Sequence, residues 1–126
     1  MLIAVQILAA LAGLLHVYIW VMESLRFADP KVHRGVFRVE TANVEVVKSW
    51  AFNQGWYNLF LAVGALVGVA VVRSEAAVGW TLIVFACGSM LAAALVLVLK
   101  DRSMAPAAFK QGLFPVLALL LSLTQL

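Results

Sequence analysis

Long apolar segments without charged residues dominate the pattern of this chain. Such segments run over 1–22, 49–72, 76–99 and 111–126. The first three are long enough to cross a bilayer core, which takes about 20 helical residues, and none shows the alternation expected of barrel strands. A membrane span must satisfy its backbone polar groups internally. We therefore predict an all-α integral membrane protein, a four-helix bundle with helices at about 1–23, 49–72, 76–99 and 106–126.

Composition agrees with this class. The chain has 126 residues, of which 65% are hydrophobic and 12% charged, and its mean hydropathy is +1.05. That leaves too little polar surface for a soluble globule. The first segment could be a signal peptide, but no Lys or Arg precedes it and no clear cleavage site follows, so we expect a retained helix. The last helix is predicted to begin near Pro106, since proline suits a first helical turn.

Basic residues are distributed unevenly among the connections between the predicted spans. The net charge is +3 and the pI is about 9.4, which in a soluble protein would suggest nucleic-acid binding. Here eight of the nine Lys and Arg residues lie in the first and third connections, and only Arg73 lies in the second. The positive-inside rule then places 24–48 in the cytoplasm and both termini outside the inner (plasma) membrane. We expect the lipid bilayer, and no nucleic acid, as the partner.

The connection 24–48 is the only substantial polar segment. Asp29 and Pro30 form a good helix start, with aspartate as N-cap. Beyond Gly35 the segment reads either as an interfacial helix continuous with the second span or as a lid over a site. A weak repeat relates 51–57 to 108–114, which would suit two parallel helical hairpins, with chance similarity over about seven residues as a serious alternative.

The most unusual feature is a polar block in the second span, Asn53-Gln54-Gly55-Trp56-Tyr57-Asn58-Leu59. Polar side chains inside an apolar segment are costly unless they are partnered. Gln54, Tyr57 and Asn58 are predicted to lie along one helical stripe, with Asn53 beside it. Either a structural network or a binding site must satisfy them.

Other polar residues are expected at the same depth as this block. His16 and Glu23 lie seven residues apart on one face of the first helix, with Trp20 between them, and Gln111 opens the fourth helix. A buried histidine with a carboxylate could do acid/base chemistry, so His16 and Glu23 are the candidate catalytic residues. The candidate ligand-binding residues are Trp20, Asn53, Gln54, Tyr57, Asn58 and Gln111. Interhelical hydrogen bonding is the structural alternative for each, and Gln6, toward the opposite face, is expected to be isolated.

Metal and cofactor motifs are not found in the sequence. The two histidines, His16 and His33, lie in different environments and no zinc-type spacing occurs. No phosphate-binding glycine loop or serine nucleophile motif is present, so we predict no metal and no cofactor. The lone Cys87 is interpreted as a small residue at a helix contact.

The chain resembles a family of small four-helix membrane proteins, mostly bacterial, known as a conserved domain of unknown function. The resemblance rests on His16-Val17-Tyr18-Ile19 with Glu23, on Phe37, and on the block from Asn53 to Ala62. It covers essentially the whole chain. It implies the fold and the importance of the block, and no activity.

Three functional hypotheses follow. The first is a binding or enzyme-like site for a small lipophilic or amphiphilic molecule, open to the cytoplasmic side, since apolar pockets with a few convergent polar groups hold such ligands. Its enzymatic form would be a proton-shuttling isomerase. The second is a small multidrug-type transporter, and the third a structural or accessory membrane subunit. A homo-oligomer is compatible with all three.

Overall fold

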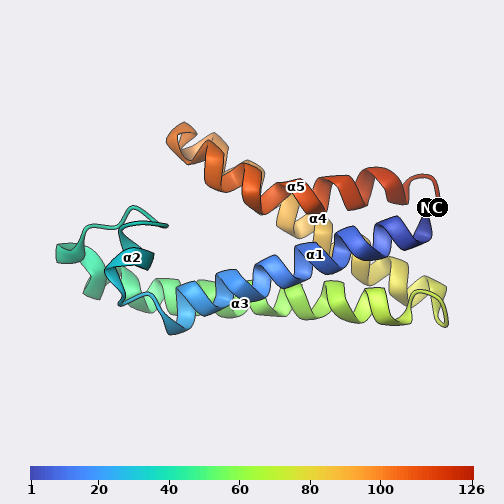
Figure 1. Cartoon of the computed structure of the whole chain (residues 1–126), viewed down its shortest axis with the longest axis horizontal. Coiled ribbons are helices and arrows are strands. Elements are labelled where there is room, and N and C mark those ends of the chain that lie inside the picture. Colours follow the sequence, from blue (N-terminus) through green and yellow to red (C-terminus); the bar gives the residue numbers. More distant parts are fainter. The chain divides into compact units, whose positions relative to one another are not determined.

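The chain is all-α and contains no strand, and four of its helices are long and apolar, as predicted for a four-helix bundle. The computed structural model describes residues 1–126. The elements in chain order are α1 (Leu2–Trp20), a π-helical turn η1 (Val21–Leu25), α2 (Pro30–His33), a 3-10 turn η2 (Thr41–Asn43), α3 (Val44–Val71), α4 (Ala76–Lys100), a second 3-10 turn η3 (Arg102–Met104) and α5 (Ala105–Ser122) (Figure 1).

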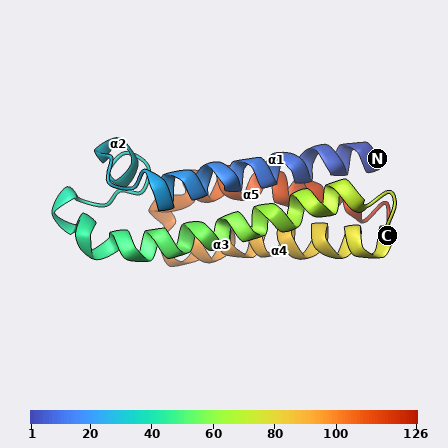
Figure 2. The same cartoon turned by 90° about the horizontal axis from the view of Figure 1, so that it is seen from below.

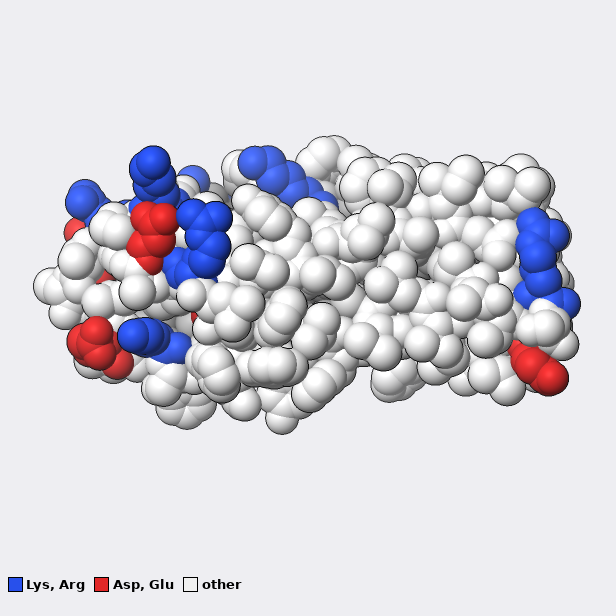
Figure 3. Space-filling view, turned by 60° about the horizontal axis from the view of Figure 1, so that its bottom comes forward, with Lys and Arg blue, Asp and Glu red and all other residues white.

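Four helical segments are long and apolar enough to cross a membrane, so the chain is a multi-pass membrane protein. They cover Leu2–Leu25, Thr41–Val71, Ala76–Lys100 and Arg102–Ser122. The space-filling view agrees with this assignment, because a broad part of the visible surface carries no charged side chain and the Lys, Arg, Asp and Glu residues gather outside it (Figure 3). Such a surface suits contact with lipid tails.

The chain divides into two compact units, each described here by itself. The bundle unit comprises residues 1–15 and 61–126, and the connection unit comprises residues 16–60. In the bundle unit α4 and α5 pack along each other, and both chain termini lie at one end (Figures 1 and 2).

Small side chains fill the core of the bundle unit. The fully or almost fully buried core residues are Val5, Ala9, Ala12, Ala65, Val72, Ile83, Ala86, Cys87, Met90 and Ala118. Between apolar helices in lipid, close packing and hydrogen bonds replace the hydrophobic effect as the source of association, so alanine and glycine let the backbones approach. Cys87 is one of these small buried residues.

Gln6 was expected to be isolated, and this expectation is wrong. Its Nε2 donates to the Val69 carbonyl at 3.0 Å, and its Oε1 accepts two bonds from the Arg73 guanidinium, at 2.9 and 3.2 Å. Arg73 lies just after the end of α3, in the turn that leads to α4, and its side chain reaches Gln6 near the start of α1. A polar residue near a helix end thus ties α1 to α3 within the bundle unit.

In the connection unit, the segment between the first two spans folds into a small ordered structure. Asp29 caps α2 by accepting from the backbone N–H of Lys31 at 2.9 Å, and Pro30 occupies the first turn, as the sequence indicates. His33 is 1% exposed. Its Nδ1 lies 2.8 Å from the Phe27 carbonyl and its Nε2 lies 3.1 Å from Thr41 Oγ1. The imidazole therefore joins the two ends of this segment.

Two helix bounds differ from those expected. α3 begins at Val44, preceded by η2, so the amphipathic stretch before Ser49 is continuous with the second span. α5 begins at Ala105 with proline in its first turn and ends at Ser122. It is followed by hydrogen-bonded turns, in which the backbone N–H groups of Thr124 and Gln125 donate to the carbonyls of Leu121 and Ser122.

Candidate functional site

The site begins where α1 widens into the π turn η1. The backbone N–H of Arg26 donates to the Val21 carbonyl at 2.9 Å, five residues back, which is the π-helical pattern. π-helical turns are rare in proteins as a whole, and those that do occur within α-helices often lie at functional sites. The turn holds Glu23 with only 9% of its surface exposed. A carboxyl group is thereby buried at the end of the first span.

Asn58 of α3 is the partner of this carboxyl group. Its Nδ2 donates to Glu23 Oε1 at 2.5 Å, and the asparagine is 6% exposed. An amide donor satisfies a buried carboxyl oxygen whether the group is charged or protonated. The pair therefore meets the requirement that buried polar groups be hydrogen-bonded.

Gly55 allows the close approach that this pair needs. A Cβ at Gly55 would overlap Ser24 Oγ and would lie 3.1 Å from both Glu23 Cβ and the Ser24 backbone nitrogen. Ser24 Oγ in turn donates to the Phe52 carbonyl at 2.7 Å. The glycine of the polar block is thus the contact point between α3 and η1, and sequence reasoning missed both Gly55 and Ser24. Glycine inside an apolar helix was the available signal, since it marks close backbone contact.

Trp20 lies one turn before Glu23 and brings an unused hydrogen-bond donor. Its Nε1 is buried and has no partner in the structure. The indole packs edge-on against Trp56, with the ring centroids 5.2 Å apart and an interplanar angle of 63°. A buried indole N–H usually finds a partner, so an unpartnered one needs an explanation.

His16 is completely buried on α1, one turn before Trp20. The candidate catalytic residues His16 and Glu23 are therefore both removed from the surface. Gln111 lies on α5 in the bundle unit, where it is partly buried.

The predicted polar stripe of α3 is only partly formed. Asn58 is buried, whereas Asn53, Gln54 and Tyr57 are exposed, Tyr57 to 61%. The helix buries the face of Gly55 and Asn58, whereas Gln54 lies about 70° and Tyr57 about 130° around the helix from it. The structure thus joins Glu23 to Asn58, with Trp20 three residues before Glu23 in the chain, and it leaves Asn53, Gln54 and Tyr57 exposed.

Outside the spans, Asp29 interacts with two basic residues close to it in the chain, Arg26 and Lys31. Hydrogen bonds from the Lys31 backbone, and then from Arg26, lower the pKa of the Asp29 carboxyl. No group of three or more His, Cys, Asp or Glu side chains in residues 1–126 is arranged to hold a metal ion.

Comparison with known proteins gives a family and no activity. Residues 10–123 match the model of a family described as protein of unknown function, DUF1304, so the chain belongs to this family. No curated protein and no solved structure matches the chain.

Proposed function

We propose that this protein binds a small lipophilic or amphiphilic molecule at a membrane-embedded site built on Glu23, Asn58 and Trp20. The observation that carries the proposal is the buried Trp20 Nε1, which has no partner, one turn from a buried carboxyl group. Polar groups held inside an apolar span are expensive and are typical of functional sites. Trp20 would donate to an oxygen of the ligand, and the apolar surroundings would hold its hydrocarbon part.

The same groups could move protons. Glu23 can accept or donate a proton while Asn58 keeps one of its oxygens fixed, and His16 is a second titratable group on the same helix. In an enzymatic form of the proposal these two residues would shuttle a proton between carbons of the ligand. In a transporter, protonation of Glu23 would be coupled to movement of the substrate.

A structural role is the main competitor, and the packing at Gly55 favours it. In that case the Glu23–Asn58 bond and the Ser24–Phe52 bond only join η1 to α3. The Trp20 N–H separates the two readings, because it forms no bond within the protein. Its removal therefore costs the scaffold no hydrogen bond, while it would remove one from a ligand.

The test is the variant Trp20→Phe, with Trp80→Phe of α4 as the matched control. Native mass spectrometry of protein purified in matched detergent would detect a co-purifying lipophile. We expect wild type and Trp80→Phe to retain the same bound mass, and Trp20→Phe and Glu23→Gln to lose it with helical content unchanged. Equal retention by all four proteins, or no bound mass on wild type, would favour the structural role.

We also propose that the protein lies in the inner membrane. Residues 24–48 would then face the cytoplasm, and both termini would lie outside. The distribution of eight basic residues against one supports this orientation. Cysteines placed at Lys31 and at Ser74, in a Cys87→Ala background, should be labelled from opposite sides. Labelling of position 31 in intact cells by an impermeant reagent would reverse the assignment.

A further inference from the structure

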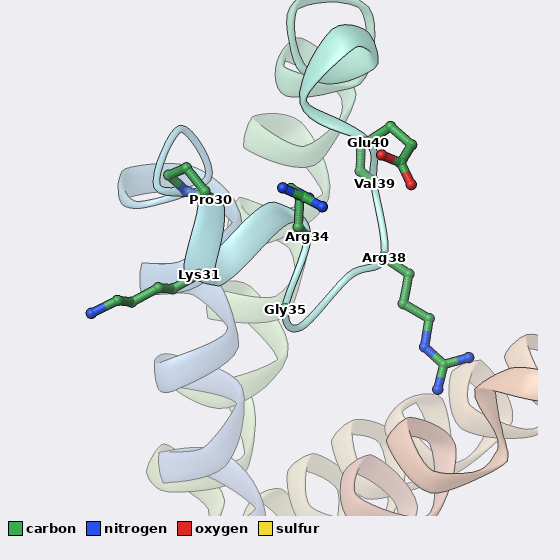
Figure 4. Close-up of a pocket in the computed structure, with 7 residues that line it drawn as sticks. All are labelled: Pro30, Lys31, Arg34, Gly35, Arg38, Val39 and Glu40. Atoms are coloured by element: carbon green, nitrogen blue, oxygen red, sulfur yellow. The ribbon is translucent and has the colours of Figure 1, made fainter.

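The connection unit contains a hollow that is separate from the Glu23 site. It has a volume of about 460 Å³, and its walls come from α2 and from the segment that leads to η2. The charged side chains that line it are Lys31, Arg34, Arg38 and Glu40, three cations and one carboxylate (Figure 4). The hollow therefore has a net positive lining.

The hollow is built on an ordered framework. Asp29 fixes the start of α2, and the buried His33 bonds to both ends of the segment. The backbone N–H of Val39 also donates to the His33 carbonyl at 2.7 Å. Since these bonds hold the segment in one shape, a ligand would meet a preformed surface and bind with a smaller entropy loss.

The backbone at Arg38 is strained. Its φ is 57°, in the left-handed region that non-glycine residues seldom adopt, and Arg38 is the only non-glycine residue with a positive φ in residues 1–126. Strain of this kind persists only where the surrounding structure imposes it, and it gathers at ligand sites. Here it places an arginine at the edge of the hollow.

Neither Lys31 nor Arg34 forms a salt bridge with a carboxylate of the chain. The salt bridge between Arg26 and Asp29, at 3.2 Å, lies outside the hollow. Figure 4 shows the Arg34 guanidinium in the space between α2 and the segment of Val39 and Glu40, with Lys31 and Arg38 extending outward on either side. Arg34 is thus the central cation.

We infer that this hollow binds the phosphate group of an anionic phospholipid. Glu40 directly precedes the span that begins at Thr41, so the hollow belongs to the part of the chain that enters the membrane. A guanidinium binds a phosphate group through two parallel hydrogen bonds, and basic residues next to a span are attracted to anionic headgroups. This inference does not depend on the Glu23 site.

The experiment measures retention of phosphatidylglycerol by the purified full-length protein, using native mass spectrometry over a lipid titration. Arg34→Gln should weaken binding about tenfold, because a charge-assisted hydrogen bond is lost. Arg34→Lys should restore only part of this affinity, since lysine keeps the charge but not the two-pronged geometry. Glu40→Gln should strengthen binding by removing a repulsive carboxylate.

Lys48→Gln is the matched control, because it removes the same charge from an exposed position on α3 outside the hollow. Its effect should be less than about threefold, as expected for a screened surface charge. Circular dichroism should show equal helicity for all variants. Equal weakening by Arg34→Gln and Lys48→Gln, or full recovery in Arg34→Lys, would show general charge attraction and overturn the site.

A second arm uses inorganic phosphate to identify the source of the phosphate group. We expect millimolar phosphate to compete weakly with the lipid and Arg34→Gln to abolish that competition. Calorimetric binding of inorganic phosphate to wild type, with no retention of phosphatidylglycerol, would assign the hollow to a soluble anion and overturn the lipid assignment.

Discussion

Gly55→Ala is expected to separate η1 from α3, because one methyl group does not fit between them. The new Cβ would overlap Ser24 Oγ and crowd Glu23 Cβ at 3.1 Å. Overpacking of this kind costs about 1–3 kcal/mol. Displacing the serine also breaks its bond to the Phe52 carbonyl, worth about 1 kcal/mol. The better helix propensity of alanine returns about 1 kcal/mol, so the net loss of unfolding free energy is about 1–3 kcal/mol.

Thermal unfolding in detergent, followed by circular dichroism, measures this loss. With an unfolding entropy of about 2.1 cal/mol/K per residue, the expected decrease in Tm is about 4–11 °C. Gly88→Ala is the matched control, since a Cβ at Gly88 meets no atom within 4 Å. That variant should be as stable as wild type or slightly more stable.

A second-site change tests the cause. Ser24→Ala removes the atom that a Cβ at Gly55 overlaps, so the double variant should be more stable than the sum of the two single changes implies. If Gly55→Ala unfolds at the same temperature as Gly88→Ala, or if Ser24→Ala gives no relief, the contact between α3 and η1 is not as tight as described.

Three further predictions concern the other polar contacts. Asn58→Leu should lower the unfolding free energy by about 1–2 kcal/mol, since it leaves the buried Glu23 carboxyl without its hydrogen-bond donor. Ser122→Ala is the control, because it removes only a bond to a carbonyl of its own helix, and it should change Tm little. His33→Phe should raise the rate of tryptic cleavage after Arg34 about tenfold, because two hydrogen bonds that close the segment are lost; an unchanged rate would show that they do not hold it. Gln6→Leu should lower Tm by breaking the contacts with Arg73 and with the Val69 carbonyl. The loss should be smaller in an Arg73→Leu background, where only the bond to Val69 remains to be broken.

Much of the fold could be predicted because length and apolarity alone decide which segments cross a bilayer. The four spans, the capped start of α2 at Asp29 and the early start of α5 all follow from local residue types. The inward face of each span was harder to predict, since lipid tails and protein cores are equally apolar and leave no amphipathic pattern. Small residues were the remaining signal.

Tertiary packing decided the rest. The π turn at Val21–Leu25 changes the direction in which Glu23 points, and the contact at Gly55 then selects Asn58, rather than Gln54 or Tyr57, as its partner. In the same way, His33 is buried because the folded segment brings the Phe27 carbonyl and the Thr41 hydroxyl to its two ring nitrogens. The sequence by itself determined the spans and their caps. Which polar side chains meet depended on close backbone contacts between residues distant in the chain, where a single methyl group or one extra residue in a turn changes the partner.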